Sequence, residues 1–349
     1  MKVKIKDITG KVVSGEWGKE DLNGTGIPVL RTTNFTNEGI IDFSDVVLRD
    51  VQKKNIEEKF LKHGDIIIEK SGGSDKQPVG RVVYFEGEEN KYLFNNFTGL
   101  LRIKEADKWI PKYVFYALFA NYCKGGTRNF ENRTTGLHNL QTDAYIERTE
   151  IVQCPIQSQK KIVKRLDGVS KLIDLHQQQM KLMDQLVKSR FIEMFGDPVK
   201  NTMRWEVVTF SEIFRMIKSG LSRKLSDDDI GLPMIRSKNI VKGVLDPSDL
   251  KYWHINDPQG ADTNEYILDD GDILVNFINS SSQIGKGCIF HDIGRPCIYT
   301  TNCFRIKLKS DCNEIYFNSY MMTEGYYRQI QSIIQPAVNQ ASFTTKNYL

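Results

Sequence analysis

The sequence predicts an α+β protein made of two similar domains, each a mostly antiparallel sheet with helices, joined by one long coiled-coil-forming helix. Three observations support this prediction. The chain has 349 residues, which is enough for two domains that each bury a core. A series of short motifs occurs twice in the same order. Between the two series lies a stretch whose apolar residues have the spacing of a coiled-coil helix.

The internal repeat organises the chain. Seven motifs return in the second half, displaced by 203 to 207 positions and in unchanged order. The pairs are 27–34 with 232–239, 39–45 with 243–249, 64–68 with 271–275, 79–81 with 284–286, 101–104 with 304–307, Tyr113 with Tyr316, and Tyr145 with Tyr348. Chance does not readily give so many matches in one order, so we interpret them as two copies of one domain.

Within each copy, short β-rich runs alternate with Gly, Asn and Ser. A helical stretch follows, at 112–122 in the first copy and at 314–327 in the second. Runs such as 65–69 and 99–103 are too short and too close together for the crossover helices of a parallel sheet, so we expect antiparallel pairing. Residues 1–6 alternate charged with β-branched side chains, which predicts a strand.

From Pro155 to Phe195 the pattern changes, and apolar residues recur at spacings of four and three. This pattern predicts one long helix that ends at the Gly-Asp-Pro sequence of 196–198. The residues expected to pair with another helix are Ile162, Leu166, Val169, Ile173, Met180, Met183 and Val187. His176 lies in the same row, where a polar residue sets register or partner choice. The predicted domains are 1–152, the helix 153–197, and 198–349.

The composition of the chain excludes several kinds of site and partner. The six cysteines include no Cys-x-x-Cys pair, which argues against a zinc site or a redox motif. A formal net charge of +4 permits a polyanionic partner without requiring one. No apolar run approaches the roughly 20 residues of a membrane span, and no signal segment is recognisable at the start. We therefore expect a cytoplasmic protein without a membrane partner.

The sequence argues against three classes of enzyme that act on nucleotides or DNA. The glycine-rich loops lack the spacing and ending of a P-loop, and no Pro-Pro pair of an amino-methyltransferase occurs. Asp65 and Glu69 could hold Mg²⁺ in a nuclease. In the second copy, however, Asp272 returns while Asn276 replaces the glutamate, so we interpret both aspartates as turn residues. We expect no catalytic residue, metal or cofactor in this chain.

Polar loops that carry Arg, Lys, Asn, Gln and Ser are the candidates for contacts with nucleic acid. Each copy has two such loops in equivalent places, at 70–77 and 124–138 in the first copy and at 279–286 and 328–340 in the second. The residues predicted to bind DNA are Lys70, Ser71, Ser74, Lys76, Arg128, Asn129, Arg133, Asn279, Ser281, Gln283, Lys286, Arg328, Gln335 and Asn339.

Two equivalent arginines leave a choice open. Arg31 and Arg236 end the same strand motif, Ile/Leu-Pro-x-x-Arg. Each could contact a phosphate or form a structural ion pair, with Asp42 and Asp246 as the candidate partners. The ion pair is favoured, because strand arginines near carboxylates often pair with them.

The order of the parts carries a family resemblance. A domain is followed by the helix signature Pro155-x-x-x-Gln159-x-x-Ile162-x-x-x-Leu166, then by 191–198 and a second copy of the domain. This plan resembles the specificity subunit of type I restriction-modification systems. The resemblance covers essentially the whole chain. It implies that each repeat is a target-recognition domain reading one half of a split double-stranded DNA target, with the helix as spacer and docking element.

The resemblance also implies partners and places the chemistry on them. Methylation subunits would bind S-adenosylmethionine, and a restriction and motor subunit would use ATP and Mg²⁺. In the family a second spacer helix usually follows the second recognition domain, whereas this sequence ends just after Tyr348. We therefore expect the long helix to self-associate or to depend on a partner helix. A non-catalytic scaffold that binds proteins and a stand-alone nuclease stay as the alternatives.

Overall fold

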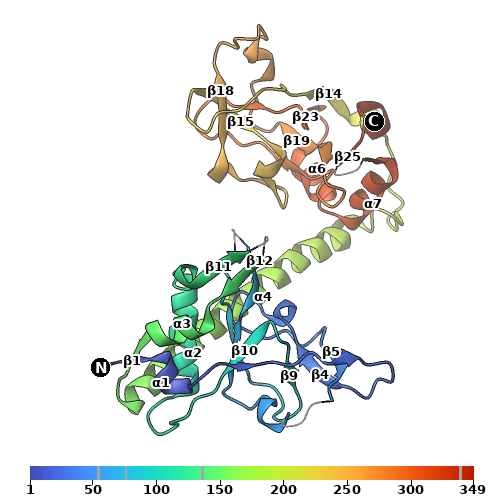
Figure 1. Cartoon of the computed structure of the whole chain (residues 1–349). Helices are drawn as coiled ribbons and strands as arrows, with labels where there is room; N and C mark the ends of the chain where they lie inside the picture. Colours follow the sequence, from blue (N-terminus) through green and yellow to red (C-terminus); the bar gives the residue numbers. More distant parts are fainter. Residues whose placement is uncertain (53–55, 75–76, 135–136, 338–339) are drawn as a thin grey trace. The chain divides into compact units, whose positions relative to one another are not determined.

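The computed structural model of the chain describes residues 1–52, 56–74, 77–134, 137–337 and 340–349 (Figure 1). It divides into two compact units, Met1–His176 and Gln177–Leu349. The boundary falls inside helix α4 (Ile156–Phe195), so each unit contains part of this helix. The α+β fold with two similar domains and a long helix agrees with the sequence-based expectation. The predicted domain boundaries stay a prediction.

The first unit is built on a four-stranded antiparallel sheet in the order β2-β10-β6-β8. Its strands are β2 (Val13–Ser14), β10 (Thr98–Leu101), β6 (Ile66–Glu69) and β8 (Val82–Tyr84). All residues of β6 and β10 are buried, as expected for short apolar runs covered on both faces of a sheet. The antiparallel pairing predicted for these two runs is confirmed.

A second sheet of the first unit has the order β3-β5-β4-β9. Its strands are β3 (Lys19–Glu20), β5 (Val47–Asp50), β4 (Ile27–Leu30) and β9 (Leu93–Phe94). β4 and β9 run parallel, whereas the other pairs are antiparallel. Leu30 and Phe94 of this sheet share an apolar cluster with Ile67 of β6. The two sheets of the unit therefore bury one face against each other.

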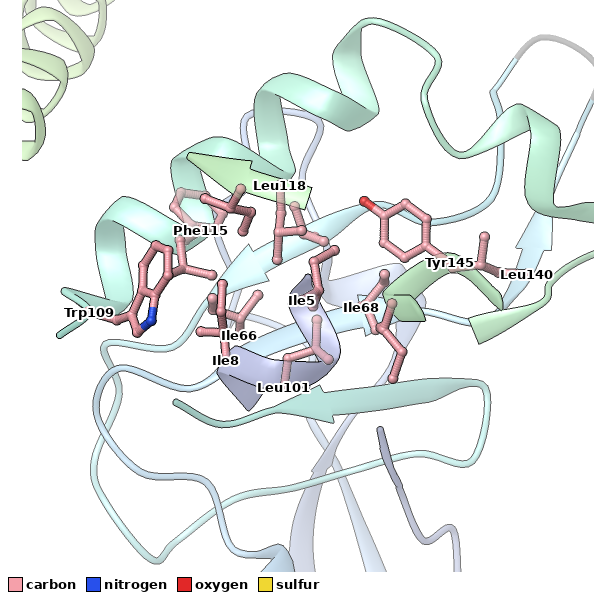
Figure 2. Close-up of a cluster of buried hydrophobic side chains, with 14 of the residues drawn as sticks. Ile5, Ile8, Ile66, Ile68, Leu101, Trp109, Phe115, Leu118, Leu140 and Tyr145 are labelled. Atoms are coloured by element: carbon pink, nitrogen blue, oxygen red, sulfur yellow. The ribbon is translucent and has the colours of Figure 1, made fainter. Parts of the chain in front are cut away.

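The main core of the first unit lies on the opposite face of β6, as the alternation of side chains along a strand requires. Ile66 and Ile68 lie in this core together with Leu101, and side chains from three helices pack against them (Figure 2). The helices are α1 (Ile5–Thr9), α2 (Pro111–Cys123) and α3 (Thr142–Arg148). Phe115 of α2 and Tyr145 of α3 are among the large side chains that close it.

The strand predicted at residues 1–6 is too long. β1 (Lys2–Lys4) pairs antiparallel with β13 (Glu150–Val152), but Ile5 begins helix α1. Ile5 and Ile8 are 0% and 1% exposed. Residues three apart share a face on a helix and point to opposite sides on a strand, so only the helix buries both.

The second unit repeats this architecture. Its four-stranded antiparallel sheet has the order β14-β23-β19-β21, and its β15 pairs antiparallel with β18 and parallel with β22, as β4 does with β5 and β9. The strands are β14 (Phe214–Ser219), β23 (Cys303–Leu308), β19 (Ile273–Asn276), β21 (Gly287–Ile289), β15 (Gly231–Ile235), β18 (Lys251–His254) and β22 (Ile298–Tyr299), with the hairpin β16 (Ile240–Val241) and β17 (Val244–Leu245). The sequence repeat is thus a repeat of strand pairing.

A buried ion pair recurs where each copy turns into its central strand. Asp65 accepts a hydrogen bond from Arg102 Nη2 at 2.6 Å, and Asp272 accepts one from Arg305 Nε at 2.5 Å. The glycine before each aspartate has a φ of +94° or +86°, which glycine adopts without strain. The Gly-Asp motifs are therefore structural turns, as the sequence predicts.

Arg31 and Arg236 also form structural ion pairs, but not with the predicted carboxylates. Arg31 Nη2 lies 2.8 Å from Asp45 Oδ2, and Arg236 Nη2 lies 3.3 Å from Asp249 Oδ2. The prediction that Asp42 and Asp246 are the partners of these arginines was wrong. Each of these accepts the backbone N–H two residues further on at 2.9 Å, so its carboxylate is held within its own turn.

The helical stretch predicted at 314–327 is two helices, α6 (Glu314–Met321) and α7 (Glu324–Ile333). The hydroxyl of Thr323 accepts a hydrogen bond from the Tyr326 N–H at 3.2 Å, which caps the start of a new helix. Periodicity alone did not reveal this break. The short helices α5 (Phe210–Ile213) and α8 (Thr345–Tyr348) complete the unit.

Helix α4 has the predicted extent and stop. Gly196 follows its last residue with a φ of +81° and donates its N–H to the Ile192 carbonyl at 2.8 Å. In the first unit, buried Gln159 holds the start of the helix by accepting from the Ile110 N–H at 2.8 Å and donating to the Lys108 carbonyl at 2.9 Å. In the second unit, Phe191 near its end is buried.

The row of apolar residues predicted to pair α4 with another helix is exposed, from 38% at Ile162 to 68% at Val187. Pairing therefore stays a prediction. Gly168 meets nothing within 4 Å of an added Cβ, so no close helix approach occurs there among the described residues. Within the described part of the chain, no helix is long and apolar enough to cross a membrane.

Candidate nucleic-acid interface

A three-stranded antiparallel sheet brings the two polar loops of the first unit together (Figure 1). Strand β7 (Ser71–Gly73) follows the central strand β6, and β12 (Leu137–Leu140) pairs with it. β12 also pairs with β11 (Glu131–Thr134), so the sheet has the order β11-β12-β7. Two loops about 60 residues apart in the sequence thus form one surface.

Direct bonds fix the two loops to each other. The Leu140 N–H donates to the Lys70 carbonyl at 2.8 Å, and the Val79 N–H donates to Glu131 Oε1 at 3.1 Å. Glu131 Oε2 also lies 3.2 Å from His138 Nδ1, and both of these side chains are buried. Neither Glu131 nor His138 is among the residues that the sequence predicts to bind DNA. The carboxylate of Glu131 and the imidazole of His138 lie on the two strands of the β11–β12 hairpin, seven residues apart in the sequence. This spacing of an acid and a histidine is the one sequence feature that could have indicated the pair.

The structure places the predicted DNA-binding residues of the first unit at different depths. Arg128 and Asn129 are exposed, just before β11. Ser74 is exposed, and its Oγ accepts the Gln77 N–H at 3.2 Å. Ser71 lies half-buried in β7. Lys76 lies outside the described residues, as does the side chain of Arg133 on β11.

Lys70 is less available than the sequence suggested. Its Nζ donates to the Ser14 hydroxyl at 2.8 Å, at the edge of the four-stranded sheet. Burial of the ammonium lowers the pKa of Lys70, and the positive charge of Lys59 lowers it further. A lysine in this position contributes less to an exposed cationic surface than Arg128 does.

The second unit builds the same small sheet from its own pair of loops. Strand β20 (Ile278–Asn279) pairs with β25 (Ala341–Ser342), which pairs with β24 (Gln335–Pro336). The Phe343 N–H donates to the Phe277 carbonyl at 3.2 Å, as Leu140 does to Lys70. Gln331 Nε2 donates to the Ser281 carbonyl at 3.1 Å and ties the two loops together. Both copies therefore join the same two loops in the same way.

The stretch 328–340, predicted as a loop, begins inside helix α7, so Arg328 lies on a helix, whereas the other described candidates of the second unit lie on β20 and β24 or in the segment after β20. Ser281, Gln283, Lys286, Arg328 and Gln335 are exposed, and Asn279 is half-buried in β20. Asn339 lies outside the described residues. The Lys286 ammonium donates to the Gln283 side chain, and Arg328 Nη2 pairs with Glu324 Oε1 at 2.6 Å one turn earlier on α7.

The acidic residues considered for a nuclease site do not converge on a metal position. Glu69 forms a two-point ion pair with Arg81, whose Nη2 and Nε lie 2.9 Å and 3.1 Å from its two oxygens. Asp65 is committed to Arg102, as described above. These carboxylates are buried and neutralised by arginine, so their geometry is that of structural ion pairs. Among the described residues, no group of three or more His, Cys, Asp or Glu could hold a metal ion.

The chain has two domains joined by a long helix, and each domain carries a small sheet that joins two polar loops. This arrangement is that of the class of DNA-reading proteins that the sequence resembles. The family profile described as the type I restriction modification DNA specificity domain matches residues 1–182. This match covers more than half of the chain. The chain belongs to this family, and it is a type I restriction-modification specificity subunit with DNA-recognition domains.

Its relatives carry the same description. The chain is 22% identical over 363 residues to the EcoKI specificity subunit of Escherichia coli K12, covering 97% of this chain and 74% of the relative. It is 23% identical over 367 residues to the StySPI specificity subunit of Salmonella potsdam, covering 98% and 75%. A putative MjaX specificity subunit from Methanocaldococcus jannaschii is 31% identical over 139 residues, which are 40% of this chain and 32% of the relative.

Solved structures share the fold. A chain from a study of complex assembly and conformational transition of the type I R-M system matches with a TM-score of 0.55 and 12% identity, covering 100% of this chain and 83% of the other. The S subunit from M. genitalium matches with a TM-score of 0.52 and 14% identity, covering 95% and 78%. At these identities the likeness supports the fold, namely two recognition domains joined by a long helix.

Proposed function

We propose that each unit of this chain reads one half of a split double-stranded DNA target, and that α4 sets the distance between the halves. The observation that carries the proposal is the repeated sheet, in which two equivalent polar loops are joined in both units. Arg, Lys, Asn, Gln and Ser side chains on such loops can reach phosphates and base edges. The loops differ in sequence between the copies, so the two halves of the target differ as well.

The helix suits the role of a spacer. α4 has 40 residues, which corresponds to about 60 Å at 1.5 Å per residue. Two readers on a helix of fixed length can occupy major-groove segments only at a defined separation, because half-site spacing follows from protein geometry. The exposed apolar row of α4 is the surface on which we place a partner helix.

We infer that the catalytic steps belong to partner subunits in the cytoplasm. In this arrangement, methylation subunits hold S-adenosylmethionine and a restriction and motor subunit uses ATP with Mg²⁺. The chain itself supplies recognition and docking and does not catalyse methylation, nucleotide hydrolysis or cleavage. The ion-paired state of Asp65 and Glu69 supports this assignment.

The proposal is tested by mapping methylated DNA in a host that expresses methylation subunits with and without this chain. We expect methylation of a motif with two separated halves, and only when the chain is present. Methylation that is unchanged without the chain would contradict the DNA-reading role and favour the alternative of a protein-binding scaffold. A binding assay with a pool of random duplexes provides an independent check, since a scaffold would select no sequence.

A further inference from the structure

A polar notch of about 340 Å³ opens in the second unit beside the start of the β20-β25-β24 sheet. Three cationic side chains line it, those of Arg223, Arg236 and Lys238. The uncharged polar residues that line it are Ser222, Ser237, Thr300, Thr301 and Asn302. No carboxylate is among the described residues that line it. The Asn302 carbonyl accepts the N–H of Phe277, the residue directly before β20, so the notch adjoins one of the predicted DNA-binding loops.

The cations are held in place by carboxylates that lie outside the lining. Arg223 Nε and Nη2 donate to Asp257 Oδ2 at 3.0 Å and 2.5 Å, and the Asp257 side chain is fully buried. Asp249 is shared, because Arg236 Nη2 donates to its carbonyl at 2.8 Å and Lys238 Nζ lies 2.5 Å from its Oδ2. Three cations against two carboxylates leave a net charge of +1. The Lys238 side chain is 70% exposed, so its ammonium can also reach a ligand.

The first unit provides an internal comparison. The Glu16 N–H donates to the Phe94 carbonyl at 2.7 Å, and the Leu221 N–H donates to the equivalent Tyr299 carbonyl at 3.0 Å, which fixes the correspondence between the copies. Counting along the chain from these bonds, Trp17 replaces Ser222, Gly18 replaces Arg223, and Thr33 replaces Lys238. Of the three cations, the first unit keeps only the equivalent of Arg236.

The first unit also carries an acid at this place. Glu16 stands where Leu221 lines the notch, and its Oε1 lies 2.5 Å from Lys59 Nζ. The first unit has the aromatic side chain of Trp17 where the second unit has Ser222. The guanidinium of Arg49 stacks on the Trp17 ring, with its Cζ 4.3 Å from the ring centroid. The cation-rich notch is therefore a feature of the second unit and is not imposed by the shared fold.

We propose that this notch binds a phosphodiester group of the DNA backbone next to the half-site read by the second unit. The inference rests on the proposed function and adds a contact outside the two predicted loops. Lysine ammonium and arginine guanidinium groups form charge-assisted hydrogen bonds with phosphate oxygens, and Ser, Thr and Asn side chains add neutral donors. A phosphate contact of this kind positions the second unit on the duplex and reads no base.

The test compares two variants of the full chain in binding to a random-sequence duplex over a range of NaCl concentrations. Lys238→Gln removes one cation, while Arg223 and Arg236 are left intact because their ion pairs hold the fold. Ser222→Asp places a negative charge in the notch and retains the Ser222 carbonyl that accepts from Arg223 at 2.8 Å. Loss of one phosphate contact lowers the slope of log affinity against log salt by about 0.9. Between 50 and 200 mM NaCl, wild type should then lose about 3.5-fold more affinity than Lys238→Gln.

Lys242→Gln is the matched control. Lys242 is also an exposed lysine that pairs with an aspartate, Asp184 at 3.0 Å, but it does not line the notch. We expect the control to keep the wild-type slope, and Ser222→Asp to weaken binding more than Lys238→Gln does. If wild type binds DNA while all three variants keep its slope and affinity, the notch is not a phosphate site. If wild type binds no DNA at any salt concentration, the proposed function itself fails.

Discussion

At the scale of single residues, a buried carboxylate that is paired with an arginine has a structural role, and Asp65 is an example. Asp65 is 2% exposed and accepts from Arg102 Nε at 2.8 Å, Arg102 Nη2 at 2.6 Å and the Lys62 N–H at 2.8 Å. Both oxygens of its carboxylate therefore accept from protein donors. Sequence alone could read the same residue as a metal ligand, because the residue type does not reveal its partners.

The substitution Asp65→Asn should therefore destabilise the first unit. It leaves the guanidinium of Arg102 without its counter-charge, and breaking one side of a buried ion pair costs about 3–5 kcal/mol. Because the Arg102 side chain is 32% exposed, we expect about 2–3 kcal/mol. Urea denaturation measures the change. Glu105→Gln, which breaks the exposed pair with Lys108, serves as control and should leave the midpoint unchanged.

Arginines of the β11 region should carry part of the DNA affinity of the first unit. Arg128 is exposed beside β11, and Arg133 lies on that strand. Changing both to Gln should weaken DNA binding and lower the salt slope by about 1–2, because each lost phosphate contact contributes about 0.9. Binding measured against salt concentration checks this. Arg148→Gln, at the end of α3, is the control, and an equal loss in the control would place the DNA-binding face elsewhere.

At the scale of elements, the repeat and the periodicity of apolar residues predicted most of the fold. The helix between the copies was found because its apolar spacing extends over many turns and a Gly-Asp-Pro sequence ends it. The errors fell where local patterns compete with tertiary packing. Residues 1–6 alternate like a strand, yet Ile5 and Ile8 enter the core as part of a helix. The β11-β12-β7 and β20-β25-β24 sheets were not predicted, since their strands have two to four residues and lie in segments rich in polar side chains.

The candidate site was predicted as separate loops and not as one surface. The loops at 70–77 and 124–138 were identified by composition, but no residue pattern indicated that the Leu140 N–H bonds to the Lys70 carbonyl. The cation-rich notch was missed for a similar reason. Arg223, Lys238 and Asn302 come from three segments that only the fold brings together.

The exposed row of α4 leads to a prediction about association. Ile173 is 52% exposed and Met180 is 63% exposed, one heptad apart. Each apolar side chain of this size contributes roughly 1.5–3 kcal/mol when it is fully removed from water, so pairing with a second helix is favourable. Replacing both residues with Asp should abolish self-association or docking of a methylation subunit, as measured by light scattering. Lys171→Asp, on the same exposed stretch but outside the apolar row, is the control.

At the scale of the whole molecule, the two units are similar in fold and different in the surfaces that they present. The first unit has Arg128 just before its small sheet and Arg133 on strand β11 of that sheet, whereas the second has Lys286, Arg328 and the notch around Lys238. Each unit closes its own core, so neither needs the other to shape its loops. Recognition by such a molecule should be modular.

Modularity predicts the outcome of an exchange of domains. Replacing residues 1–152 with the equivalent segment of another specificity subunit should change one half of the methylated motif and leave the other half and the spacing unchanged. The physical reason is that the loops of the second unit are held by bonds within that unit, such as Gln331 Nε2 to the Ser281 carbonyl, and α4 is retained. Sequencing of methylated DNA from cells that express the chimera with methylation subunits gives the result. A chimera in which only residues 70–77 and 124–138 are exchanged should behave in the same way, because these loops form the joined surface of the first unit. A change in both halves of the motif would show that the two units read DNA together.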